Sequence, residues 1–353
     1  MIAALPEWLG ILLAFLCSLL ISYAMTPPVK RFAEQVGAID VPKDNRRVHT
    51  IPIPRMGGLA IFLGFVLSLI IFVPMNTQVL GLLVGAVIIA VMGAIDDIVA
   101  LSAWIKLAAQ IIAAIVAIRC GIVFDAISNP NIFSSETYIE IGYLSVPLTM
   151  LWIVGCTNAV NLIDGLDGLA VGVSAISSLT MLVVSLLVAS PIVSIILAAL
   201  LGACLGFMPY NANPAKIFMG DVGSQLLGFV LAAASTMGLF KLHAIITFIV
   251  PMMALIVPLA DTTFAFVRRI ARGQSPFHAD KGHFHHRLLA MGLSQKQAVA
   301  VLYAVSAFAG LLAVLLAGTS PVIKIICLVI AFCIAVAMWF FVLRRMPRHN
   351  EKK

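Results

Sequence analysis

The chain has 353 residues, of which 62% are hydrophobic and only 10% are charged, and its net charge is +7. Soluble domains carry about 25% charged residues, so this composition excludes an ordinary soluble globular protein. Apolar runs of about twenty residues recur along the whole sequence, as in transmembrane helices. A β-barrel is excluded because these runs do not alternate between apolar and polar residues. The sequence therefore predicts an all-α integral membrane protein.

Eleven transmembrane helices are expected. In chain order they cover residues 8–26, 56–74, 78–95, 103–120, 146–160, 169–188, 192–208, 222–239, 244–266, 298–318 and 322–343. With the N-terminus outside, 19 of the 22 Lys and Arg residues fall on the inner side, and only Arg119, Lys241 and Lys324 fall outside. The positive-inside rule then places the C-terminus in the cytoplasm.

The whole chain, residues 1–353, is expected to form a single polytopic membrane domain. Its predicted cytoplasmic loops are 27–55, 96–102, 161–168, 209–221 and 267–297, and the outer segment 121–145 resembles a hairpin in its alternating pattern. The charge bias accounts for the net charge without a nucleic-acid partner. A basic inner face instead suits anionic membrane lipids and phosphate ligands.

The first polar cluster follows the third predicted helix, in "AIDDIVALSAWIKLAAQ" (94–110). Adjacent carboxylates such as Asp96 and Asp97 repel each other and are costly near a membrane, so their presence indicates a divalent cation or a reacting proton. Lys106 follows Asp97 by nine residues and can lie near the pair. The alternatives are a charged pair that marks a helix end and an interfacial lysine that reaches toward water.

The second cluster is "NAVNLIDGLDGLAVG" (158–172), at the inner end of the fifth predicted helix. Residues three apart share one face of a helix, so Asn158, Asn161 and Asp164 are expected to line up. Gly165 and Gly168 permit a tight turn around Asp167. Amide and carboxylate oxygens suit Mg²⁺ or hydrogen bonds to a sugar or base, and the alternative is a polar turn between two helices.

The third cluster is "KIFMGDVGSQ" (216–225), just before the eighth predicted helix. A carboxylate such as Asp221 at a helix N-terminus is stabilised by the helix dipole, and a metal–phosphate complex fits the same place. Phe218 can stack on a flat base, or it can simply pack against lipid or the core. The P-loop pattern GxxxxGK[ST] is absent.

The fourth cluster is "RRIARGQSPFHADKGHFHHRLL" (268–289). Three histidines, His283, His285 and His286, follow Arg269 and other basic residues, and such donors fit a diphosphate. Zinc is a rival ligand for the histidines, although HExxH is missing and no cysteine is near. A solvated basic loop is the third interpretation.

All four clusters face the cytoplasm in the predicted topology. Acidic groups for a divalent metal, basic groups for phosphates and a place at the lipid boundary together favour phosphoryl transfer, which depends on positioning and cations more than on covalent chemistry from the protein. A secondary transporter is the alternative of another class. Transporters place their carboxylates near the midplane between repeated halves, and no half-repeat is evident here.

Five motifs in the same order resemble the polyprenyl-phosphate N-acetylhexosamine-1-phosphate transferases. They are "PKDNRRVHTIPIPRMGG", "GAIDD", "NAVNLIDGLDGL", "FMGDVGS" and "SPFHADKGHFHH", between about residues 27 and 290. The HxHH pattern at 283–286 is similar to the WecA/TagO-like branch. The resemblance implies about ten or eleven helices, a cytoplasmic active-site cleft and a location in the bacterial plasma membrane.

The resemblance also implies the reaction. Undecaprenyl phosphate would attack the sugar-bearing phosphate of UDP-GlcNAc, giving undecaprenyl-diphospho-GlcNAc and UMP, with Mg²⁺ as the cofactor and Mn²⁺ as a substitute. The first membrane step of a cell-envelope glycopolymer is of this kind. The alternative within the superfamily is the phospho-MurNAc-pentapeptide transferase. The sequence does not decide between a monomer and a homodimer.

Residue roles follow from the matched motifs. Asp96 and Asp97 resemble the carboxylates that deprotonate or orient the lipid phosphate, and Asp221 and Asn161 resemble metal ligands. The remaining positions resemble substrate contacts: Lys106 and Arg269 as diphosphate clamps, Phe218 as the base-stacking ring, His283, His285 and His286 beside sugar and phosphates, and Asn158, Asp164 and Asp167 on the substrate side.

Overall fold

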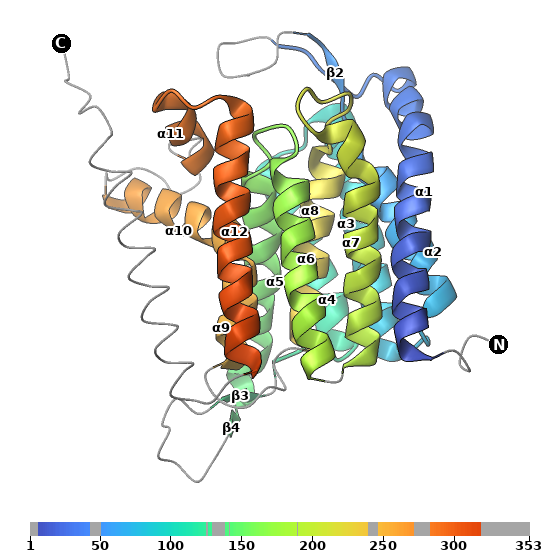
Figure 1. Cartoon of the computed structure of the whole chain (residues 1–353), viewed down its shortest axis with the longest axis vertical. Coiled ribbons are helices and arrows are strands. Elements are labelled where there is room, and N and C mark those ends of the chain that lie inside the picture. Colours follow the sequence, from blue (N-terminus) through green and yellow to red (C-terminus); the bar gives the residue numbers. More distant parts are fainter. Residues whose placement is uncertain are drawn as a thin grey trace.

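Figure 1 shows the computed structural model, a bundle of helices that run mostly side by side. The structure describes residues 6–42, 51–124, 126–128, 138–140, 142–188, 190–238, 246–271 and 283–318. The eleventh predicted span, 322–343, lies outside these residues, as do the middle of the predicted loop 27–55, part of loop 267–297 and most of the outer segment 121–145.

The first half of the chain alternates long helices with two short antiparallel strand pairs. The helices are α1 (Glu7–Gln35), α2 (Gly58–Phe72), α3 (Thr77–Val99), α4 (Ala103–Arg119) and α5 (Ser145–Leu162), the last preceded by a short 3-10 turn, η2 (Gly142–Leu144). Strand β1 (Ile39–Asp40) pairs with β2 (Ile53–Pro54), and β3 (Ala126–Ser128) pairs with β4 (Tyr138–Glu140). The two pairs lie at opposite ends of the bundle (Figure 1).

The second half is helical throughout its described part. It contains α6 (Leu169–Leu187), α7 (Pro191–Asn211), α8 (Gly220–Gly238), α9 (Ile246–Ala254), α10 (Ile256–Ala271), α11 (Phe284–Ala290) and α12 (Gln295–Gly318). Figure 1 shows α11 at the same end of the bundle as β2. This shared end, which we call the β2 end, also receives the last turn of α1.

Six helical segments of the described chain are long and apolar enough to cross a membrane. They are Glu7–Gln35, Thr77–Val99, Gly142–Leu162, Leu169–Leu187, Pro191–Asn211 and Gln295–Ala317, and the 15-residue helix Gly58–Phe72 is a shorter apolar one. The structure is therefore that of an all-α membrane protein. The count of eleven spans stays a prediction.

Two predicted spans differ from the helices at their positions. Helix α1 continues nine residues beyond the expected end at 26, through Pro27 and Pro28, so the predicted loop 27–55 begins as helix. The expected span 244–266 is two helices, α9 and α10, which meet at Leu255. Pro258 has no N–H to donate to the carbonyl of Ala254, which is the last residue of α9. Helix α10 then lies nearly perpendicular to the long helices, at one side of the bundle (Figure 1).

Helix α8 is the centre of the bundle, and almost all of its residues are buried. Glycines allow its neighbours to approach its backbone closely. A Cβ atom on Gly93 of α3 would lie 2.5 Å from the backbone nitrogen of Val222, and one on Gly228 would lie 2.6 Å from the carbonyl oxygen of Cys156 in α5. Small residues are how helices pack closely in a membrane, where burial of apolar surface gives little driving force. The N-terminus of α8 is thereby fixed against the ends of α3 and α5.

Candidate active site

Asp97 caps the N-terminus of α8. Its carboxylate accepts hydrogen bonds from the backbone nitrogens of Asp221 (3.0 Å) and Val222 (3.4 Å), and the Nε atom of Arg55 lies 3.5 Å away. Gly220 precedes this cap with φ +73°, and a Cβ atom there would overlap the Asp97 carboxylate. A carboxylate is favourable at this point because the free N–H groups of the helix point at it. The structure thus gives Asp97 a position that is fully buried, where it orients Asp221.

Lys106 joins two of the predicted site carboxylates. Its Nζ atom lies 3.0 Å from Oδ2 of Asp96 and 2.9 Å from Oδ2 of Asp221, although Asp221 is 115 residues away in sequence. Asp96 also accepts a 2.7 Å hydrogen bond from the backbone nitrogen of Leu101, in the turn between α3 and α4. The ends of α3, α4 and α8 therefore converge on one ammonium group.

Asn161 completes the surroundings of Asp221. Its Nδ2 atom donates to Oδ1 of Asp221 (3.2 Å) and to Oγ of Ser224 (2.8 Å), so the last turn of α5 is joined to the first turn of α8. Asn158 lies one turn earlier and points into the bundle, where its amide exchanges hydrogen bonds with Gln110 of α4. Of the two asparagines expected to line up, Asn161 therefore faces the site, and Asn158 faces the interior of the bundle. A substrate contact for Asn158 stays a prediction.

The turn between α5 and α6 holds the other two acids of its motif in different surroundings. Asp164 as a whole residue is partly exposed, but its carboxyl group is buried. This burial, together with the negative charges of Asp221 and Asp97, raises the pKa of Asp164 to about 8, although Arg55 opposes the shift. Asp167 instead accepts hydrogen bonds from Nδ2 of Asn213 (2.9 Å) and the backbone nitrogen of Ala215 (3.0 Å). Asp167 thereby ties this turn to the one between α7 and α8.

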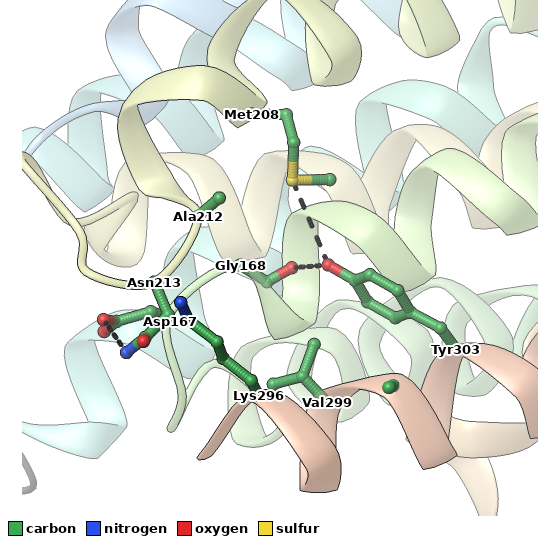
Figure 2. A pocket seen from close by; sticks show the side chains of 9 residues that line it. Asp167, Gly168, Met208, Ala212, Asn213, Lys296, Val299 and Tyr303 are labelled. Carbon is green, nitrogen blue, oxygen red and sulfur yellow. Dashed lines mark hydrogen bonds between the residues drawn. The ribbon is translucent and has the colours of Figure 1, made fainter. Parts of the chain in front are cut away.

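Helix α12 supports the same turn from the other side. The hydroxyl of Tyr303 donates a 2.5 Å hydrogen bond to the carbonyl oxygen of Gly168, and Asn211 accepts one from the Gly168 nitrogen (3.1 Å). Figure 2 shows Tyr303, Gly168 and Asp167 around a pocket of about 410 Å³, with Lys296 extending along it. The remaining lining is mostly apolar: Met208, Ala212, Asn213, Val299 and Ala300.

The histidine motif is held by a buried carboxylate of α10. Asp261 accepts from Nδ1 of His283 (2.8 Å) and from the backbone nitrogen of Phe284 (2.6 Å), so it fixes the start of α11. The ring of His285 stacks at 5.8 Å from that of His283 and lies 4.3 Å from that of His286. Burial, together with the neighbouring His286, lowers the pKa of His285 to about 4, so this imidazole is neutral at pH 7.

The structure brings His285 to the acidic turn. A Cβ atom on Gly165 would lie 2.5 Å from Nε2 of His285, so the absence of a side chain there permits the approach of α11. Phe218 is fixed by backbone hydrogen bonds, since its nitrogen donates to Pro54 (2.8 Å) and its carbonyl accepts from Gly57 (2.9 Å). Arg269 lies in the last turn of α10, on the helix that holds the histidine motif. The first three clusters thus meet at Lys106, Asp221 and Asn161, and the histidines of the fourth reach the second cluster at Gly165.

Comparisons with known proteins identify the family. The sequence model of glycosyl transferase family 4 matches residues 79–239, which include Asp96, Lys106 and Asp221. A probable undecaprenyl-phosphate N-acetylglucosaminyl 1-phosphate transferase of Bacillus subtilis is 45% identical over 83% of this chain and 81% of its own length. A decaprenyl-phosphate N-acetylglucosaminephosphotransferase of Mycobacterium tuberculosis is 38% identical over 82% and 78%, respectively.

The chain belongs to glycosyl transferase family 4. Within it, the chain is a member of the WecA/TagO-like polyprenyl-phosphate sugar-phosphate transferases. A phospho-N-acetylmuramoyl-pentapeptide-transferase of Staphylococcus epidermidis is also similar, at 34% identity over 73% of this chain and 83% of its own length. The family resemblance of the sequence motifs is therefore confirmed.

The oxygen ligands near Asp221 suit the magnesium ion that the family implies. The described residues contain no group of three His, Cys, Asp or Glu side chains placed to hold a metal on their own. Mg²⁺ does not require one, since it is usually bound by one or two carboxylates together with water and substrate phosphates. Asp221 offers carboxylate oxygens, and Asn161 turns its amide nitrogen toward them, with Nδ2 3.2 Å from Oδ1 of Asp221. The carboxylate therefore fits the ion as it stands, and Asn161 would present its oxygen to the ion with the amide turned over.

Several site residues of this transferase were not singled out from the sequence. Arg55 falls at the end of the predicted loop 27–55 and Asp261 within the predicted span 244–266, and neither received a role. Gln110 and Gln225 each lie four residues after a predicted site residue, Lys106 and Asp221. Because residues four apart share a helix face, that spacing was the available signal for both glutamines.

Proposed function

We propose that this transferase moves GlcNAc-1-phosphate from UDP-GlcNAc to undecaprenyl phosphate, giving undecaprenyl-diphospho-GlcNAc and UMP. The observation that best supports this is the joining of Asp96 and Asp221 through Lys106, where α3 ends and α4 and α8 begin. Carboxylates and a cation gathered at the end of apolar helices suit a reaction between a lipid phosphate and a water-soluble diphosphate. The names of the two similar sugar-phosphate transferases support the choice of GlcNAc.

The proposed step is a displacement at phosphorus. An oxygen of the lipid phosphate attacks the sugar-bearing phosphorus of UDP-GlcNAc, and a new P–O bond forms. The bond from that phosphorus to the bridging oxygen breaks, and its electron pair leaves with UMP. Such a reaction is accelerated mainly by positioning and by stabilising negative charge.

The charge of each side chain determines its proposed role in the reaction. Asp221 and Asn161 would hold Mg²⁺, which, when bound, neutralises phosphate charge. Lys106, now placed between two carboxylates, provides a further positive charge for the diphosphate. Asp96 orients the lipid phosphate, and Asp97 keeps Asp221 in place. His285 is neutral at pH 7 and offers a hydrogen bond next to the 163–168 turn without adding charge.

In this proposal the β2 end faces the cytoplasm, because nucleotide sugars are made there, and the protein lies in the bacterial plasma membrane with its N-terminus outside. The lysine and arginine bias of the sequence supports this orientation. The eleventh span and a cytoplasmic cleft that opens to both substrates belong to the same proposal.

The decisive test is transfer by the purified protein in detergent with undecaprenyl phosphate, Mg²⁺ and a panel of labelled UDP-sugars. We expect lipid-linked GlcNAc and UMP in equal amounts, loss of turnover with a chelator, recovery with Mg²⁺ and partial recovery with Mn²⁺. Asp221→Asn should abolish turnover while the protein still inserts and purifies normally. Transfer of MurNAc-pentapeptide phosphate but not of GlcNAc-1-phosphate would replace the proposed substrate.

A further inference from the structure

A chain of three amide side chains leads from the interior of the bundle to Asp221. Gln225 donates from Nε2 to Oδ2 of Asp221 (3.0 Å), and its Oε1 accepts from Nε2 of Gln110 (2.8 Å). Oε1 of Gln110 accepts from Nδ2 of Asn158 (2.6 Å), which also donates to the carbonyl oxygen of Val154 (2.9 Å). The chain thus crosses from α5 through α4 to α8.

Both ends of this amide chain can only accept hydrogen bonds. One end is the backbone carbonyl of Val154 and the other is the carboxylate of Asp221. Turning over any one of the three amides would place two N–H groups or two oxygens face to face, so a single arrangement satisfies them all. Gln110 and Gln225 are 2% and 1% exposed, and an unpaired polar group at such depth costs about 1–3 kcal/mol.

We propose that Gln110 and Gln225 are positioning residues for phosphoryl transfer. Gln110 fixes the direction of the Gln225 amide, and Gln225 in turn holds Asp221 beside Lys106 and Asn161. This inference rests on the proposed function, because it assigns the chain of amides to the carboxylate that takes part in the reaction. Gln225 donates to the same Oδ2 atom of Asp221 that Lys106 contacts, so both glutamines act through this carboxylate.

Variants that conserve side-chain shape distinguish a positioning role of the glutamines from a packing role. Methionine nearly matches glutamine in length and helix preference but cannot donate to a carboxylate. We expect Gln225→Met to lower kcat about 10- to 100-fold, the range typical for residues that orient a metal ligand. Gln110→Met should have a smaller effect. The double variant should match Gln225→Met alone, since Gln110 acts only through Gln225.

Gln110→Glu tests whether the hydrogen bond that Gln110 donates to Gln225 is the one that matters. The glutamate can still accept from Asn158 but cannot donate to Gln225, so we expect it to behave like Gln110→Met. Ser235→Ala is the matched control, because it removes a buried hydrogen bond from Trp152 (3.0 Å) between the same two helices, α5 and α8, far along α8 from Asp221. We expect this control to keep its turnover within two-fold of the wild type.

Binding provides a second readout that does not depend on turnover. Thermal stabilisation of the purified protein by UDP plus Mg²⁺ should be reduced in Gln225→Met and Gln110→Met, and unchanged in Ser235→Ala. Wild-type levels of turnover and stabilisation in folded Gln225→Met, or losses that multiply in the double variant, would overturn the inference. A wild-type protein that transfers no sugar phosphate would refute the proposed function instead. The binding comparison between variants would then still test whether the two glutamines position Asp221.

Discussion

At the scale of single residues, Lys106 is the charged group that links the carboxylates of the site. Its ammonium contacts both Asp96 and Asp221, and only 27% of its side chain is exposed. Lys106→Met should lower kcat about 100-fold, as expected for loss of a positioned charge at a phosphoryl-transfer site. The measurement is turnover of labelled UDP-GlcNAc. Lys30→Met on α1, whose lysine pairs with Glu34 on the surface, is the control and should be near wild type.

Asp164 gives the site a pH dependence in the absence of metal. Its pKa of about 8 lies far above the ordinary value of 3.8, so the folded protein keeps a proton that the unfolded chain releases. Stability should therefore fall as the pH rises from about 4 to 8. In chelator, Asp164→Asn should show a smaller fall in melting temperature over this window. Equal slopes for the variant and the wild type would refute this, and Glu34→Gln on α1 is the control.

At the scale of elements, Asp261 connects α10 to α11. Its carboxylate is 2% exposed and receives two hydrogen bonds from the start of the histidine motif. Asp261→Asn should cost about 1.5–3 kcal/mol of stability, because it weakens charge-assisted hydrogen bonds. Turnover should fall as well, since His285 would lose its fixed place. Thermal unfolding and labelled-sugar transfer check this. Ser294→Ala, which removes an exposed cap at the start of α12, should affect stability alone.

The support of the α5–α6 turn by α12 makes a different prediction. Tyr303→Phe removes one hydroxyl that donates to the carbonyl of Gly168, and the ring can stay in place. One such bond is worth about 1 kcal/mol, so we expect KM for UDP-GlcNAc to rise about five-fold with kcat nearly unchanged. Steady-state kinetics separate the two constants. A fall in kcat without a change in KM would show that this turn serves the chemical step instead.

The sequence predicted the elements of the site better than their connections. Acid and amide spacing located Asp96, Asn161 and Asp221 on helix ends, because long apolar runs fix where each helix meets water. Lys106 and Asp221 are 115 residues apart, and their contact depends on how α4 and α8 both pack on α3 and α5, which no local pattern contains. The split of the ninth span also depends on packing, since a proline alone kinks one helix and breaks another.

At the scale of the whole molecule, orientation is the property to measure. Glu34 lies exposed at the β2 end of α1, and Glu140 lies exposed on β4 at the opposite end. Single cysteines at these positions should react with an impermeant maleimide from opposite faces of oriented vesicles. We expect Glu34→Cys to be labelled only from the cytoplasmic face and Glu140→Cys only from the outer face. The wild type, with its six cysteines, provides the background. The reverse pattern would refute the proposed topology.

The glycine contacts around α8 have a consequence for how such an enzyme can change. Because Gly93 and Gly228 bring neighbouring backbones against this helix, any shift of α8 would meet backbone atoms rather than flexible side chains. Adaptation to a different sugar or lipid would therefore have to come from the turns and from α10 and α11. Asp96, Asp97 and Asp221 would keep their positions while the surrounding turns change.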